Sequence, residues 1–131
     1  MRRVLDSYAL LAFFEKEPGF EKVESALIEA NEKDRNLLMT AVNFGEVYYI
    51  VLREYGQRKA DEIEKIIQTL PIDMIDVDKN LAKEAARFKA LKAISYADCF
   101  AAVLAKMNKA ELITGDKEFK EVKDKIKVLW I

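Results

Sequence analysis

Residues 2–14, RRVLDSYALLAFF, place a short strand directly before a helix. The segment from Arg2 to Asp6 has the length of a strand. After Ser7, apolar side chains recur at helical spacing until Pro18 and Gly19 end the pattern. A strand that runs straight into a helix predicts the first unit of an α/β chain.

The rest of the chain continues this alternation. Further strands are expected at residues 37–41, 72–77, 111–114 and 127–130, and amphipathic helices at 20–31, 43–55, 60–70, 81–92 and 95–107. Alternating elements joined by right-handed crossovers favour a parallel sheet. The sequence therefore predicts a three-layer α/β/α sandwich with a parallel sheet of about five strands.

The composition agrees with one globular domain over residues 1–131. Hydrophobic residues make up 51% of the chain and charged residues 34%, with only 4 Gly and 2 Pro, which excludes disordered and low-complexity classes. The formal net charge is −1, so no overall basic field is available to hold nucleic acid. The chain has no histidine, which rules out Ser-His triads and histidine zinc sites.

The single cysteine and the absence of a long apolar run bear on location. Cys99 has no partner for an internal disulfide, so a reducing compartment, the cytoplasm, is expected. The apolar run Tyr8–Phe14 is far shorter than the ~20 residues that a membrane span needs. We therefore expect neither export nor membrane anchoring.

Acidic residues follow several of the predicted strands. Open parallel sheets bind ligands at the carboxyl ends of their strands. The acids at those positions are Asp6 after the first strand, Glu46 in the first turn of the helix after the second strand, Asp98 in the first turn of the helix opened by Ser95, and Asp116. If the sheet forms as predicted, these four carboxylates converge.

Converging carboxylates require a physical explanation. Two like charges ~4 Å apart repel by roughly 4 kcal/mol at an effective dielectric near 20. Either some carboxyls are protonated, or the group binds a hard cation, and oxygen ligands alone favour Mg²⁺ or Mn²⁺. The competing interpretation is structural, because Ser95 and Asp98 have the spacing of a capping box and Gly115-Asp116 is ordinary turn chemistry.

Several short motifs resemble those of PIN-domain ribonucleases, and the size resembles VapC-type toxins within that family. The pieces span nearly the whole chain in the family's order: Val4-Leu5-Asp6-Ser7, Glu46 early in an apolar helix, Ser95-Tyr96-Ala97-Asp98, and Thr114-Gly115-Asp116 with Phe119 behind it. The resemblance implies Mg²⁺-dependent endonucleolytic cleavage of RNA and a small antitoxin partner that blocks the site. It also implies a catalytic quartet of Asp6, Glu46, Asp98 and Asp116, with supporting hydroxyls on Ser7 and Thr114.

In the mechanism that this resemblance suggests, Asp6, Asp98 and Asp116 hold one or two Mg²⁺ ions, directly or through water. Glu46, the fourth residue of the predicted metal set, orients a ligand water or the nucleophile. A bound cation polarises the phosphodiester and neutralises the developing charge, which replaces the missing histidine.

Lysines near the predicted site are candidate phosphate contacts. Lys89, Lys92 and Lys117 could meet RNA at the rim of the site. Lys89 stands where many relatives carry arginine, and it keeps the charge but loses bidentate geometry. Exposed apolar helix surface further suggests a homodimer.

Other polar residues are interpreted as structural. Asp73 and Asp76 are predicted to lie in or beside an edge strand, and Asp78 is predicted to cap a helix. Residues 117–127 alternate lysines with acids, including Glu118, and are expected to form a solvated face. Cys99 is expected to be a small buried filler.

Two other functional classes remain open at the sequence level. A carboxylate-based phosphoryl-transfer domain would also use acids at strand ends, although no Asp-x-Asp pair follows the first strand. The other alternative is a non-catalytic module that keeps the PIN fold and binds RNA or protein. Cleavage of RNA with Mg²⁺, or acyl-phosphate formation on Asp6, separates these classes.

Overall fold

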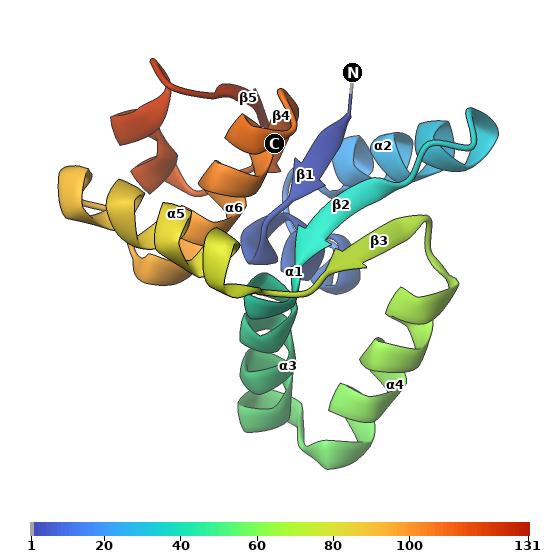
Figure 1. Cartoon of the computed structure of the whole chain (residues 1–131). Coiled ribbons are helices and arrows are strands. Elements are labelled where there is room, and N and C mark those ends of the chain that lie inside the picture. Colours follow the sequence, from blue (N-terminus) through green and yellow to red (C-terminus); the bar gives the residue numbers. More distant parts are fainter. Residues whose placement is uncertain (1) are drawn as a thin grey trace.

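A sheet of five parallel strands forms the centre of the computed structural model, which describes residues 2–131 (Figure 1). The spatial order is β3-β2-β1-β4-β5, and every neighbouring pair is parallel. The strands are β1 (Arg3–Leu5), β2 (Leu37–Thr40), β3 (Ile72–Ile75), β4 (Glu111–Thr114) and β5 (Lys127–Trp130). The predicted five-stranded parallel sheet is confirmed.

Six α-helices and one 3-10 helix connect these strands within residues 2–131. They are α1 (Ser7–Glu15), α2 (Phe20–Glu32), α3 (Ala41–Tyr55), α4 (Gln57–Thr69), α5 (Lys79–Leu91), α6 (Tyr96–Met107) and the 3-10 helix η1 (Lys117–Val122). The sequence did not predict η1. Helix α3 also begins earlier than expected, because Thr40 at the end of β2 caps it directly by accepting from the Asn43 backbone N–H.

The two faces of the sheet pack against different helices. Val4 and Leu5 are neighbours in β1 and both are fully buried, but they belong to separate hydrophobic clusters. Val4 packs with residues of α5, α6 and η1, whereas Leu5 packs with residues of α1 to α4. Helices therefore cover both faces, and the predicted three-layer sandwich is confirmed.

The strand order reverses direction between β1 and β4. From β1 the chain builds outward through β2 to β3, and it then returns to add β4 and β5 on the other side. A reversal of this kind leaves a crevice at the carboxyl ends of the two strands, which is the usual ligand position in open α/β sheets. Because Leu5 pairs with Ile113, Asp6 and Thr114 follow as neighbours at that crevice.

The opposite end of the sheet carries a network of ion pairs. Arg3 donates to Glu29 at 2.9 Å and to Glu111 at 3.0 Å. Asp73 in the edge strand β3 accepts from Arg2 and from Asn36. Asp73 therefore has the structural role expected from the sequence, away from the candidate site.

None of the helices within residues 2–131 has both the length and the apolar character required to cross a membrane.

Candidate functional site

Asp6 lies directly beyond β1 and is almost completely buried, with 1% of its surface exposed. As the cap of α1, its Oδ1 accepts from the Ala9 backbone N–H at 2.8 Å. Its Oδ2 accepts from the hydroxyl of Thr114. Burial is the main reason why the pKa of Asp6 is raised to about 7. The two hydrogen bonds lower this pKa, and the negative charges of Asp98 and Asp116 raise it further.

Asp98 lies in the first turn of α6, as predicted. Its backbone N–H donates to Ser95 Oγ at 3.2 Å, so the expected helix cap is present. Its side chain is also buried, and burial together with the charges of Asp116, Glu46 and Glu118 raises the pKa of Asp98 to about 7. Capping therefore involves the backbone of Asp98 and leaves its carboxylate facing other acids.

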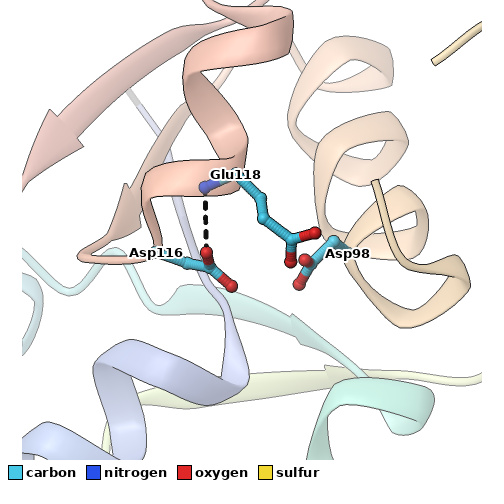
Figure 2. Close-up of side chains that lie close together, drawn as sticks. All are labelled: Asp98, Asp116 and Glu118. Atoms are coloured by element: carbon cyan, nitrogen blue, oxygen red, sulfur yellow. Dashed lines mark hydrogen bonds between the residues drawn. The ribbon is translucent and has the colours of Figure 1, made fainter. Parts of the chain in front are cut away.

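Asp98 is one of three carboxylates that point toward one another (Figure 2). Oxygen atoms of Asp98, Asp116 and Glu118 all lie within 4.8 Å of one another. Asp116 Oδ1 accepts from the backbone N–H of Glu118 at 2.9 Å, which caps η1 and turns Glu118 toward Asp98. Glu118 is exposed, as predicted for this charged run, but the sequence did not predict that its carboxylate lies beside Asp98 and Asp116.

Glu46 approaches the same region from α3. The predicted position of Glu46 in the first turn of its helix is wrong, because α3 begins at Ala41 and Glu46 therefore lies in the second turn. The hydroxyl of Ser7 donates to Glu46 Oε1, and the charge of Glu46 acts on Asp98. The two hydroxyls predicted to support the site thus each donate to a different predicted acid. Ser7 donates to Glu46, and Thr114 donates to Asp6.

The structure therefore brings the four predicted acids to one end of the sheet in two arrangements. Asp98 and Asp116 belong to the three-carboxylate group with Glu118. Asp6 and Glu46 lie outside that group, and each is held by a hydroxyl. The charges of Asp98 and Asp116 act on Asp6, and the charge of Glu46 acts on Asp98.

No ion pair balances the charge of the acidic group in the described part of the chain. Within residues 2–131, no lysine or arginine forms an ion pair with Asp6, Glu46, Asp98, Asp116 or Glu118. Carboxylates ~4 Å apart repel by roughly 4 kcal/mol at an effective dielectric near 20. A set of oxygen donors with this unbalanced charge fits a hard divalent cation.

An aromatic ring borders the site. Tyr8, which follows Ser7, is 47% exposed and lies against the backbone of Gly115. A Cβ added at Gly115 would lie 2.3 Å from Tyr8 Cε1, so no larger residue fits beside the ring in this position. Glycine is therefore required between Thr114 and Asp116 for this close approach.

The predicted basic residues differ in their surroundings. Lys89 donates from Nζ to the carbonyl of Ile94 at 2.8 Å and so braces the segment that leads into Ser95. Lys117 is exposed at the start of η1, and Lys92 is half-buried after α5. Cys99 is completely buried next to Asp98, in agreement with a filler role.

The fold and the acidic group together define an α/β/α protein with a candidate cation site at the switch point of a parallel sheet. The chain belongs to the PIN domain family, whose model matches residues 3–125. The resemblance noted in the sequence is thereby confirmed.

Similar proteins carry names from toxin-antitoxin systems. Ribonuclease VapC30 of Mycobacterium tuberculosis is 24% identical over 123 residues, covering 88% of this chain and 91% of that protein. VapBC2 from Rickettsia felis, solved with a DNA fragment from its promoter, shares the fold with a TM-score of 0.77, 16% identity and 98% of each chain covered. The M. tuberculosis toxin VapC20, described as cleaving the sarcin-ricin loop, shares the fold with a TM-score of 0.72, 14% identity and coverage of 92% of this chain and 94% of that one.

Proposed function

We propose that this chain is a metal-dependent endoribonuclease that acts as the toxin of a toxin-antitoxin pair. The observation that carries the proposal is the group of Asp98, Asp116 and Glu118, whose oxygens lie within 4.8 Å and which forms no ion pair with a basic residue among residues 2–131, in a chain of the PIN domain family. The names of its relatives as VapC ribonucleases support RNA as the substrate.

Mg²⁺ is the proposed cofactor, with Mn²⁺ as a substitute, because both prefer oxygen ligands. Asp98, Asp116 and Glu118 would hold the ion, with Asp6 and Glu46 beside them as ligands directly or through water. When bound, the ion polarises the phosphodiester and compensates the charge that develops during hydrolysis.

The protein's own groups prepare this site. Thr114 holds Asp6 by donating its hydroxyl, and it also accepts from the Asp116 backbone N–H at 3.0 Å. Ser7 fixes Glu46, which we propose orients the attacking water. Since the pKa values of Asp6 and Asp98 are raised to about 7, these groups release protons as a cation binds.

Lys89, Lys92 and Lys117 remain proposed phosphate contacts at the rim. Each would contribute charge rather than base recognition. Lys89 is the most constrained of the three, because its ammonium already donates to Ile94.

A cognate antitoxin protein is the proposed partner, since the similar R. felis protein was solved as the VapBC2 assembly. The chain would work as a single PIN domain over residues 1–131, in the cytoplasm, where RNA is accessible.

We also propose a homodimer. Leu91 and Met107 are 82% and 51% exposed, and with Phe88 and Val103 they form the apolar part of a hollow of about 460 Å³ between α5 and α6, whose other lining residues are Glu84, Arg87 and Lys106.

Cleavage of RNA under metal control tests the enzymatic proposal. The purified protein, free of antitoxin, is incubated with total RNA and with defined hairpins in Mg²⁺, in Mn²⁺ and in EDTA. We expect discrete fragments with either ion and none in EDTA. Asp98→Asn should reduce the rate at least ~100-fold, because it removes charge from the donor set.

Asp124→Asn is the matched control, because Asp124 is an exposed acid outside the cluster. It should cleave at the parental rate. Absence of cleavage by the parent, with Asp98→Asn indistinguishable from it, would favour the non-catalytic module. Acyl-phosphate on Asp6 would instead favour phosphoryl transfer.

A further inference from the structure

Asn43 is a completely buried amide on α3, one helical turn before Glu46. Buried amides require partners for both the donor and the acceptor end. Both ends of Asn43 are satisfied, and its partners lie in two different elements.

The donor end of Asn43 reaches across to α6. Nδ2 donates to the carbonyl oxygen of Ala97 at 3.1 Å, and Ala97 directly precedes Asp98 in the first turn of that helix. One side chain therefore ties the beginning of the helix that carries Glu46 to the beginning of the helix that carries Asp98.

The acceptor end is fixed by the sheet. Thr40, the last residue of β2 and fully buried, donates from Oγ1 to Asn43 Oδ1 at 2.5 Å and accepts from the Asn43 backbone N–H at 3.0 Å. This double contact determines which end of the amide faces Ala97. The amide is thus a bridge of defined orientation between β2, α3 and α6.

The carboxylates of Glu46 and Asp98 lie on the two helices that this bridge connects, and their repulsion opposes the close approach of the helix ends. Glu46 and Asp98 carry like charges that interact, and no basic side chain within residues 2–131 forms an ion pair with either of them. Without a cross-link, repulsion favours separation of the two helix ends. A short hydrogen-bonded link close to both acids resists that movement.

We infer that Asn43 is a positioning residue that sets the distance between Glu46 and Asp98 through its bridge from Thr40 to Ala97. The inference rests on the proposed function, in which these acids form part of the cation and catalytic site. Asn43 itself touches neither the ion nor the RNA. Its effect is exerted through the placement of the two helices.

Mn²⁺ affinity, measured by electron paramagnetic resonance on the full chain without RNA, is the primary test. We expect Asn43→Ala to weaken Mn²⁺ binding by about 10-fold or more, the range found when residues behind metal ligands are removed. In cleavage assays kcat should fall by more than about 10-fold, with KM for RNA within about twofold, since small misplacements act on the reacting geometry.

A double-mutant cycle separates positioning from general stability. If Asn43 acts by spacing Glu46 from Asp98, then Asn43→Ala introduced into a Glu46→Gln chain should weaken Mn²⁺ binding by less than about threefold. Asn108→Ala is the matched control, because it also removes an amide-to-carbonyl bond, from Nδ2 to Leu104 at 2.8 Å, at the other end of α6. Its Mn²⁺ affinity should stay within about twofold of the parent.

If Asn43→Ala does not show the parental circular dichroism spectrum, Asn43→Leu replaces it in the same measurements, because leucine keeps the buried volume filled without the amide. Unchanged Mn²⁺ affinity, an equal loss in the Glu46→Gln background, or failure of both Asn43 variants to fold would overturn the inference while leaving the proposed function intact. A parent protein that neither binds Mn²⁺ nor cleaves RNA overturns both.

Discussion

The hydroxyl of Thr114 donates a hydrogen bond to Oδ2 of Asp6, although 108 positions separate the two residues in the chain. They meet because β1 and β4 are adjacent parallel strands at the point where the strand order reverses. The same hydroxyl oxygen accepts from the backbone N–H of Asp116. A single threonine thus connects the buried acid of one strand to the acid that follows the next.

Thr114→Val keeps the shape of this side chain but removes its donor. The buried Asp6 carboxylate would lose one of its two hydrogen bonds, so we expect a loss of about 2 kcal/mol in the free energy of unfolding at pH 8. The loss should be smaller at pH 5, where Asp6 is protonated, and RNA cleavage should fall at least ~10-fold. Urea unfolding at both pH values measures the first effect.

Thr69→Val is the control for this threonine, because Thr69 donates to the Ile66 carbonyl on an exposed helix end. It should change stability by less than about 0.5 kcal/mol and leave cleavage unaltered. Equal losses for Thr114→Val at pH 5 and pH 8 would contradict the role of the ionised Asp6.

Gly115→Ala should displace the Tyr8 ring from its place beside the site. The new Cβ would overlap Tyr8 Cε1. Because the Tyr8 side chain is 47% exposed and its ring can move toward solvent, we expect a loss of less than about 1 kcal/mol in the free energy of unfolding, below the cost of overpacking a core. Gly45→Ala provides the contrast, because nothing lies within 4 Å of a Cβ at that helical position. It should stabilise the protein by roughly 0.5–1 kcal/mol. Thermal unfolding distinguishes the two, and in a Tyr8→Ala background the cost of Gly115→Ala should largely disappear.

Much of the site could be predicted because strand ends are visible in the sequence. Asp6 and Asp116 follow short apolar runs, and parallel pairing brings the ends of such runs together. The positions of β4 and β5 and the caps at Asp78 and Ser95 could be predicted for the same reason, since each depends on residues within a few positions.

Features that depend on non-local contacts could not be predicted in this way. Glu118 lies in a run of alternating charges, whose local pattern is that of a solvated surface. Only the 3-10 turn of η1, capped by Asp116 and anchored by the buried Phe119, directs Glu118 toward Asp98. The spacing of Asp116 and Glu118 before a buried aromatic residue was the available signal. The Asn43 bridge had no comparable signal, because it depends on how α3 and α6 pack.

Stability without metal should decrease as the pH rises from about 5 to 8. The pKa values of Asp6 and Asp98 are about 7 in the folded protein, above the ~3.9 of an unfolded aspartate. Between these values the folded state binds more protons than the unfolded state, so raising the pH favours unfolding. Between pH 5 and pH 8 the decrease in the free energy of unfolding corresponds to roughly 2–3 kcal/mol for one such carboxyl. Tm in EDTA should therefore be lower at pH 8 than at pH 5.5.

Divalent cations should reverse this trend, because they bind the ionised form. Mn²⁺ should raise Tm more at pH 8 than at pH 5.5. Asp98→Asn should reduce the pH dependence in EDTA, and Asp124→Asn should retain it. If Tm of Asp98→Asn in EDTA changes with pH as much as Tm of the parent, groups other than Asp98 cause the pH dependence.

Glu118→Gln tests whether Glu118, whose position beside Asp98 and Asp116 was not predicted from the sequence, belongs to the cation site. The substitution keeps the size of the side chain and removes one of the three charges whose oxygens lie within 4.8 Å. We expect Mn²⁺ affinity to fall by about 10-fold or more, with stability in EDTA at pH 8 unchanged or higher because repulsion of Asp98 and Asp116 is relieved. Glu121→Gln is the matched control, since Glu121 is exposed on the same 3-10 helix and lies outside the carboxylate group. Titration calorimetry with Mn²⁺ and thermal unfolding in EDTA measure the two effects. Equal Mn²⁺ affinities for the two variants would remove Glu118 from the site and leave Asp98 and Asp116 to bind the ion with Asp6.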